Sequence, residues 1–384
     1  MLRWFTAGES HGPQLTVLME GLPAGLDLSS ADLTPDLRRR QGGHGRGGRQ
    51  QIEVDEARIV SGVRGGVTLG SPLTLVIVNR DHANWVAEMT PEKEGFDPKP
   101  VTALRPGHVD LAGALKYGHS DVRNVLERSS ARETASRVAA GGVAKKLLAE
   151  FGVSVTSFTQ SIGQVDIGYD AVDPAALDAQ EIGESPVRCP VPEAGRRMVE
   201  EIDAAAERGD TLGGTFRVIA TGLPPGLGSH VHWDRKLDAR LAMAIISINA
   251  VKGVEFGAGF EGAGRPGSAF HDEIDFSEGR FRHLTNRAGG LTGGTTNGEP
   301  VDLRAAIKPI STMKKPMQSV DLKTKEKVAA HYERSDVCVV PAAGVIGEAM
   351  VALVLAESFL EKFGGDSVAE IERNRRGYLE SIGR

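Results

Sequence analysis

Cysteine and aromatic residues are scarce in this chain, which has two cysteines, four tyrosines and three tryptophans among 384 residues. Cys189 and Cys338 form no CxxC pair, so neither a disulfide framework nor a cysteine zinc site is indicated, and a reducing cytosol is expected. The shortage of rings removes the stacking surfaces that single-strand nucleic-acid binders use. Together with a formal net charge of -6, it argues against a nucleic-acid partner.

Targeting signals and several common catalytic motifs are also absent. Residues 1–12, MLRWFTAGESHG, lack the apolar core of a signal peptide, and no apolar run approaches the length of a membrane span. We therefore expect a cytoplasmic protein with no membrane partner. The sequence has no HExxH motif, no GxSxG elbow and no GxxxxGKS/T loop, so it predicts no metal site, serine nucleophile or P-loop.

Glycine is abundant by contrast, with 48 residues, and 40% of the chain is hydrophobic. Such a chain can bury a large core, and its glycines indicate many tight turns. Because there is no sequence repeat and no clear linker, we expect residues 1–384 to form one compact domain. The hydrophobic pattern predicts helices at 30–40, 131–151, 234–251 and 347–363, and strands at 14–20, 67–78, 214–221 and 301–307. Strand pairs without regular strand–helix alternation favour an α+β fold.

Capping residues suggest where two of these helices begin. Ser130 followed by Glu133 has the spacing of a capping box, so a helix is predicted to start at Ser130, and Asp234 is expected to cap the helix at 234–251. The unpaired backbone N–H groups after Ser130, flanked by Arg128 and Arg132, can hold a phosphate or carboxylate. The alternative is that Ser130 is only a helix cap.

Two histidines are predicted to lie in exposed turns. His108 follows Pro106 and Gly107, and His11 follows Ser10 in the turn GESHG, between two predicted strands. An exposed imidazole near an anion site can carry protons. Each histidine is equally consistent with a solvated surface residue.

A glycine- and arginine-rich loop, QGGHGRGGRQ, spans residues 41–50. It contains a GxGxxG match but follows the basic residues 38–40 instead of an apolar strand, so an NAD-type dehydrogenase is not supported. We favour the interpretation that Arg40, Arg46 and Arg49 converge on a multiply charged anion. Solvated loop charges and an RGG-like RNA-binding segment are the alternatives, and a steep salt dependence of single-strand binding would support the second.

A second glycine-rich turn covers residues 288–298 and is followed by KPIST at 308–312. A lysine and two hydroxyls after such a turn predict an anion or cofactor cradle, with an ordinary turn as the alternative. The region 81–104 carries three prolines and many charges, so we expect a mobile surface loop that could act as a lid.

The chain resembles the chorismate synthase family over nearly its whole length and in the same order of motifs. The matching blocks are GESHG (8–12), RRRQGGHGRGGR (38–49), RPGH (105–108), RSSARETASRVAAGGVAKKLL (128–148), SINAVKGVEFG (247–257), GGLTGGTTNG (289–298), KPIST (308–312) and RSDVCVVPAA (334–343).

The resemblance implies a carbon–oxygen lyase that converts 5-enolpyruvylshikimate 3-phosphate to chorismate by trans-1,4-elimination of phosphate, in the shikimate pathway toward aromatic amino acids. Reduced FMN is required although no net redox change occurs, and NADPH is a candidate reductant of the flavin. The implied fold is an α+β sandwich in which two antiparallel β-sheets enclose a helical layer, assembled as a homotetramer.

The resemblance also assigns residue roles. His11 would protonate the leaving phosphate and His108 the reduced flavin, while Ser10, Ser130 and Asp336 match a proton relay near flavin N5. Arg40, Arg46 and Arg49 match positions that bind the substrate anions. The positions that match FMN contacts are Arg128, Ser129, Ser130, Asn249, Ala250, Gly293, Lys308, Pro309, Ile310, Ser311, Thr312 and Arg334.

Overall fold

The computed structural model describes residues 1–47, 53–277, 279–333 and 335–383. A four-stranded antiparallel sheet forms in the N-terminal part, in the order β1 (Arg3–Ala7), β2 (Gln14–Glu20), β7 (Leu73–Val78) and β4 (Ala57–Ser61). Alternate residues of β2, such as Leu15, Val17 and Met19, are buried and form one wall of the core.

A five-stranded antiparallel sheet forms from later parts of the chain. Its order is β11 (Val251–Phe256), β16 (Val301–Ile307), β10 (Gly214–Thr221), β8 (Ser154–Ile162) and β9 (Val165–Asp166). The predicted strands 14–20, 214–221 and 301–307 are thereby confirmed with the same bounds. The mixture of helices with antiparallel sheets confirms an α+β fold.

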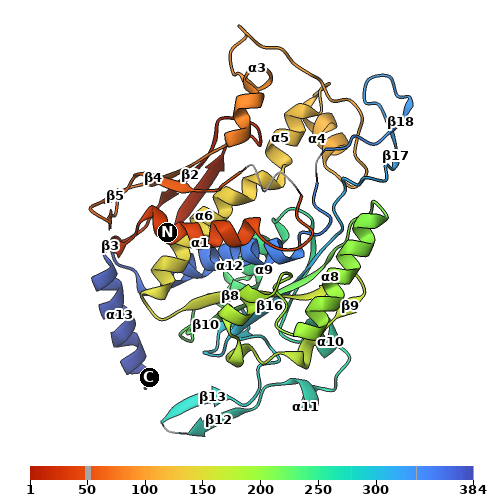
Figure 1. Ribbon diagram of the computed structural model, residues 1–384. Coiled ribbons are helices and arrows are strands. Elements are labelled where there is room, and N and C mark those ends of the chain that lie inside the picture. Colours follow the sequence, from red (N-terminus) through yellow and green to blue (C-terminus); the bar gives the residue numbers. More distant parts are fainter. Residues whose placement is uncertain (48–52, 278, 334, 384) are drawn as a thin grey trace.

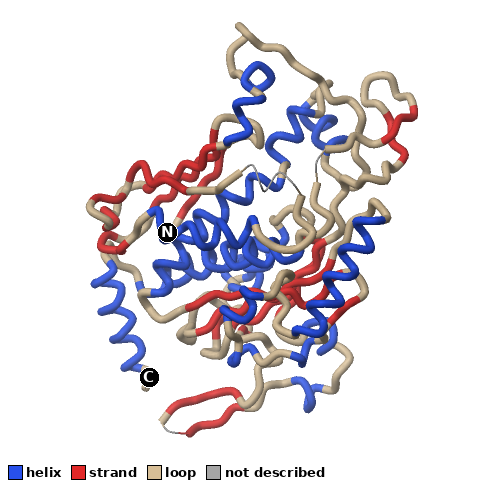
Figure 2. Tube along the Cα trace, in the orientation of Figure 1, coloured by secondary structure: helices blue, strands red, loops and turns tan. Residues whose placement is uncertain are grey.

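Four helices make up most of the helical core: α1 (Ser30–Gln41), α6 (Thr134–Ala149), α9 (Leu237–Ile246) and α12 (Val340–Phe363). Helix α6 packs on β2 and β7, α12 packs on β8 and β10, and the two helices pack on each other (Figures 1 and 2). A side chain at Gly141 of α6 would collide with Ala349 of α12, so glycine is required for this close approach.

Helix α12 is, within the described part of the chain, the one helix long and apolar enough to cross a membrane, but 83% of its most apolar window is buried inside the protein. It is therefore a core helix. It begins at Val340, seven residues before the predicted start, with Pro341 in its first turn. The short apolar segment before Pro341 has the residue types of a strand, but at its position the structure has only an isolated bridge between Leu212 and Cys338.

Two further element predictions are wrong in their bounds. Helix α9 ends at Ile246, and it could not extend to residue 251, because Ala250 has φ 67° and Val251 already begins strand β11. Asp234 lies in a short 3₁₀ turn and bonds His232 at 2.6 Å, so it does not cap α9. The predicted strand 67–78 is divided by Gly70, at φ 78°, into β6 (Val67–Leu69) and β7.

The helix predicted over 131–151 is also divided. Helix α5 (Arg123–Ser129) ends at Ser130, which is extended, and a 3₁₀ turn (Ala131–Glu133) leads into α6. Ser130 Oγ accepts a hydrogen bond from the Arg132 N–H at 3.3 Å. Glu133 does not complete the capping box, because its carboxylate binds Thr6 and Arg137 instead.

The remaining elements lie around this core (Figure 1). They are β3 (Ala24–Asp27), β5 (Val63–Arg64), α3 (Val86–Met89), α4 (Asp110–Tyr117), α7 (Ala179–Glu184), α8 (Pro192–Glu207), α10 (Gly259–Gly262), α11 (Gly267–Phe270), β12 (Ile274–Ser277), β13 (Arg280–His283), β14 (Leu291–Thr292), β15 (Thr295–Thr296), β17 (Gln318–Val320), β18 (Lys327–Ala329) and α13 (Val368–Ser381).

Candidate active site

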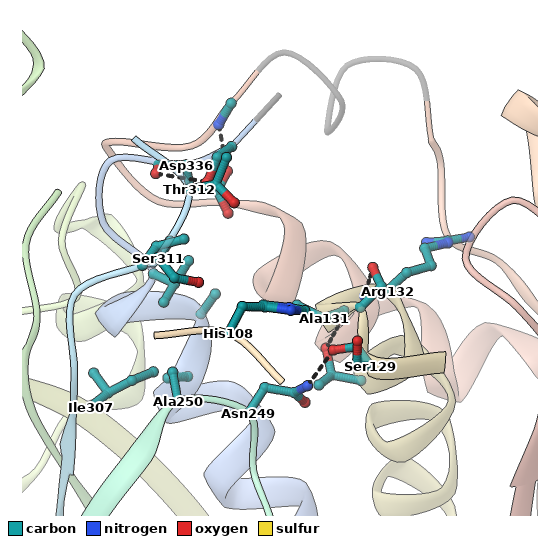
Figure 3. A pocket seen from close by; sticks show the side chains of 18 of the residues that line it. His108, Ser129, Ala131, Arg132, Asn249, Ala250, Ile307, Ser311, Thr312 and Asp336 are labelled. Atoms are coloured by element: carbon teal, nitrogen blue, oxygen red, sulfur yellow. Dashed lines mark hydrogen bonds between the residues drawn. The ribbon is translucent and has the colours of Figure 1, made fainter. Parts of the chain in front are cut away.

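A cavity of about 380 Å³ opens where segments far apart in the sequence meet. Its size lies within the roughly 300–1,000 Å³ typical of small-molecule sites. The walls come from the end of α1, the turn before α4, the junction between α5 and α6, the link between α9 and β11, the segment after β16 and the start of α12 (Figure 3). The predicted site residues among the lining are Arg40, Arg46, His108, Ser129, Ser130, Asn249, Ala250, Lys308, Ile310, Ser311, Thr312 and Asp336.

Arg40 is almost fully buried at the end of α1. Its guanidinium donates to Asp55 Oδ2 at 3.0 Å, to the Ala131 carbonyl at 3.0 Å and to Thr134 Oγ1 at 2.9 Å. Burial and repulsion from Arg132 and Arg46 lower its pKa to about 10, although Asp55 opposes the change. Arg40 therefore remains a cation at neutral pH and holds the α5–α6 junction beside the cavity.

Arg132 lines the same wall and is also nearly buried. Its Nε donates to Asn79 Oδ1 at 2.9 Å, and it forms an ion pair with Asp55. Within the described part of the chain, Arg132 Nη2 is buried without a hydrogen-bond partner, and its nearest carboxylate, on Glu53, lies 3.6 Å away. Such an unused buried donor favours an anionic ligand.

Asn79 connects this arginine to the GESHG turn. Its side-chain N–H₂ donates to the carbonyls of Glu9 at 3.1 Å and Gly12 at 2.7 Å, while its Oδ1 accepts from Arg132. The turn that carries His11 is thus tied directly to the cavity wall.

His108 lines the cavity and is held by Asp110, to which its Nδ1 is bonded. Arg105 donates to both oxygens of the same carboxylate, at 2.9 Å from Nε and 3.1 Å from Nη2. Although burial acts in the opposite direction, these bonds from His108 and Arg105 lower the pKa of Asp110 to about 2. The carboxylate is therefore ionised throughout the neutral range.

His11 is not among the residues that line the cavity, and neither is Ser10. Ser10 reaches the lining through its hydroxyl, which donates to Ser130 Oγ at 3.0 Å. The His11 ring is covered by Trp85, with ring centroids 4.1 Å apart, and its Nδ1 lies 2.9 and 3.1 Å from the two oxygens of Glu127. Trp85 belongs to the predicted lid, so this part of that segment packs on a candidate site residue.

The link between α9 and β11 also presents an amide to the cavity, beside the α5–α6 junction. Asn249 Nδ2 donates to the Ser129 carbonyl at 3.0 Å (Figure 3), and its Oδ1 is buried without a partner in the described structure. Nearby, burial and the charge of Lys252 lower the pKa of Lys308. An amide oxygen in this position can accept a hydrogen bond from a ligand ring.

Comparison with known proteins identifies the family. The family model of chorismate synthase matches residues 2–360. The chain belongs to the chorismate synthase family. It is 56% identical to chorismate synthase of Geobacter metallireducens and 53% identical to that of Thermobifida fusca, in both cases over 100% of this chain and 99% of the relative. A crystal structure of chorismate synthase matches 100% of the chain, and 98% of its own, with 42% identity and a TM-score of 0.80.

Some residues that the family resemblance assigns lie away from the cavity or outside the described structure. Arg128 is half-exposed and donates to Thr6, and Pro309 does not line the cavity although both of its neighbours do. Gly293 forms the turn between β14 and β15, which packs near His230, and it is not brought to the cavity within this chain. Arg49 and Arg334 fall outside the described residues.

One cavity arginine, Arg105, was not assigned to the site from the sequence, although it lies in the block RPGH that resembles chorismate synthase. Arg132 was expected from the sequence only as a residue that flanks an anion-binding helix start. The described residues contain no cluster of three or more histidine, cysteine or carboxylate side chains able to hold a metal ion.

Proposed function

We propose that this protein converts 5-enolpyruvylshikimate 3-phosphate to chorismate by trans-1,4-elimination of phosphate, with reduced FMN required and no net redox change. As a member of the chorismate synthase family it is a lyase of the shikimate pathway, which leads to aromatic amino acids. The observation that carries the proposal is one cavity lined by four arginines, His108, and several hydroxyl and amide groups.

The arginines that line the cavity suit the substrate, because it carries a phosphate and two carboxylates. Arg40, Arg46, Arg105 and Arg132 line the cavity, and Arg49 follows in the same loop. Guanidinium groups bind such anions through paired charge-assisted hydrogen bonds. The buried and unpartnered Nη2 of Arg132 is the clearest vacant donor for them.

The hydroxyl and amide groups that line the cavity suit the polar groups of FMN. Ser129, Ser130, Asn249, Ala250, Lys308, Ile310, Ser311 and Thr312 would hold it, and the unpartnered Asn249 Oδ1 fits a ring N–H of the flavin. Bound reduced FMN would supply an electron transiently to the substrate. Contacts from Arg128, Gly293, Pro309 and Arg334 rest on the family resemblance alone. NADPH as the reductant of the flavin is likewise proposed from the resemblance.

Proton transfers are assigned to the two histidines and to a relay. His11 would protonate the departing phosphate, His108 would protonate the reduced flavin, and Ser10, Ser130 and Asp336 would accept the second proton. The bond between the Ser10 and Ser130 hydroxyls at 3.0 Å supports the first link of the relay. Asp336 faces the cavity while it accepts from Arg46 at 2.8 Å and from the Gly47 N–H at 2.5 Å.

We further propose that residues 1–384 form a single domain in which the two sheets enclose the helices as a sandwich. The contacts of α6 with one sheet and of α12 with the other support this arrangement. A cytoplasmic homotetramer is the proposed assembly, on the basis of the family resemblance.

The test is anaerobic phosphate release from 5-enolpyruvylshikimate 3-phosphate, first with photoreduced FMN and then with oxidised FMN plus NADPH and no added reductase. Release with reduced FMN is expected. Release in the second reaction as well would mean that the protein reduces its own flavin, whereas no release in either would overturn the proposed function. Arg132→Ala is expected to raise the KM for the substrate, because it removes the unpaired donor.

A further inference from the structure

We infer that Glu127 is the positioning residue of His11, because its carboxylate holds the imidazole with Nδ1–H bonded and leaves Nε2 as the atom that transfers the proton. The consequence for turnover rests on the proposed role of His11 as proton donor. The geometry of the pair stands independently of that role.

One carboxylate binds both the backbone and the ring of His11. Glu127 Oε2 accepts from the His11 backbone N–H at 2.8 Å, and the ring Nδ1 lies 2.9 Å from Oε1. The Glu127 carbonyl also accepts from the Ser10 N–H, at 3.0 Å. Both partners are less than one-tenth exposed, so helix α5 fixes the conformation of the GESHG turn together with the ring.

The chemistry of the contact determines the tautomer. An ionised carboxylate can only accept, so Nδ1 must carry a hydrogen in both the neutral and the protonated ring. Nε2 is then the nitrogen that gains or loses a proton. No hydrogen bond to Nε2 is formed by any residue in the described ranges, so this nitrogen remains available to a reactant.

Neighbouring groups keep both partners in place. Trp85 stacks on the ring at 4.1 Å and blocks one of its faces, and the Arg123 guanidinium lies 4.9 Å from the centre of the Trp85 ring. Arg123 also approaches Glu127 Oε1 at 3.4 Å. Although burial acts against it, the bonds from His11 and the charge of Arg123 lower the pKa of Glu127, so the carboxylate stays an acceptor.

The experiment compares wild type, Glu127→Gln and Glu127→Asp by two readouts. Nitrogen-15 spectra of histidine-labelled protein report the tautomer of His11, whose signal is identified by its loss in His11→Gln. We expect the Nδ1–H form in wild type and a mixture in Glu127→Gln, because an amide can donate as well as accept. Turnover should fall by roughly a hundredfold in Glu127→Gln with KM unchanged, and Glu127→Asp should recover part of it.

Glu133→Gln is the matched control. Glu133 is a similarly buried carboxylate six residues later, but it bonds Thr6 and Arg137 and neither histidine. Its substitution should leave the His11 tautomer and kcat unchanged.

A wild-type tautomer and wild-type kcat in Glu127→Gln would overturn the inference. If Glu127→Gln does not fold, Glu127→Asp decides, because a shorter carboxylate that holds Nδ1 less well should give a lower kcat than Glu133→Gln. If wild type itself releases no phosphate while the tautomer of His11 still changes in Glu127→Gln, the proposed function fails and the positioning of His11 by Glu127 stands.

Discussion

His11 and His108 each bond a buried carboxylate through Nδ1, but the two pairs are built differently. Asp110 is shared, since Arg105 donates to both of its oxygens, whereas the Arg123 guanidinium approaches Glu127 at only 3.4 Å. His108 lines the cavity and Trp85 covers His11. The negative charge of Glu127 therefore acts mainly on His11, while that of Asp110 is divided between a histidine and an arginine.

This difference suggests a division of labour between the proposed proton donors. His108 stands where it can exchange a proton with a ligand in the cavity, and Asp110 orients it together with Arg105. Trp85 covers the ring of His11, and Glu127 and Asn79 fix the turn that carries it. We therefore expect the proton of His11 to be shielded from bulk water until a reactant reaches Nε2. The substitutions below test whether the two pairs differ in this way.

The largest effect should come from Asp110→Asn. Arg105 would lose its nearer ionised partner in a buried site and keep only the Glu333 carboxylate, 3.7 Å away, and breaking such a pair costs about 3–5 kcal/mol of unfolding free energy. Chemical denaturation would measure the loss. Asp234→Asn is the control, because Asp234 forms an exposed pair with His232 at 2.6 Å and should change stability little. Equal, small losses in both variants would contradict the structural role given to Asp110.

His11→Ala and His108→Ala should each lower turnover by roughly a hundredfold or more, as lost proton donors, while the protein still folds. Steady-state phosphate release with reduced FMN measures the effect, and circular dichroism checks the fold. His232→Ala, which removes an exposed histidine, should retain full activity. Near-normal turnover in both of the first two variants would rule out the proposed roles.

Trp85→Ala should lower turnover less than the histidine substitutions do, and it should act through His11, because Trp85 covers that ring. Removing the ring that covers His11 admits water and frees the imidazole, so we expect about a tenfold loss in kcat. Trp233→Ala provides the comparison, because Trp233 is exposed and lies beside His232 with ring centroids 6.0 Å apart. Unchanged activity in Trp85→Ala would show that the cover over His11 has no part in turnover.

The last expected effect is a pH dependence of stability. The pKa of Asp110 is about 2 in the folded protein and its usual value is 3.8, so the stabilisation it provides is present above pH 3.8 and is lost as the pH falls toward 2. Unfolding free energy measured across that range should decline in wild type and decline less in Asp110→Asn. If the unfolding free energy declines equally with pH in both proteins, a group other than Asp110 titrates in this range.

Local patterns were sufficient to predict the strands that alternate buried and exposed residues, such as β2, and some residues of the cavity wall, such as Arg40, His108 and Lys308. They missed the partners of the histidines. Glu127 meets His11 across 116 residues of sequence, and nothing in its own neighbourhood indicates that contact. Asp110 is two residues from His108 and five from Arg105, so its pairing with both is a local contact, but the motif RPGH alone does not indicate it.

The element errors have a similar cause. At Ser130 the sequence fits a capping box, but Thr6 and Arg137 bind the Glu133 carboxylate and leave the box incomplete. The apolar residues before Pro341 have strand propensity, but they form only one isolated bridge, because the helix that packs on β8 and β10 already begins at Val340. In each case a contact with a distant segment overrides the local preference.

The contact between α6 and α12 at Gly141 and Ala349 determines how closely the two helices approach each other. The first turn of α6 contributes Thr134 to the cavity wall, and the first turns of α12 contribute Ala342 and Ile346. Because Gly141 has no side chain, the two helix backbones pack directly against each other there, and any larger residue would push the helices apart. Since both helices also contribute to the cavity wall, we expect a larger residue at Gly141 to change the cavity as well as the core.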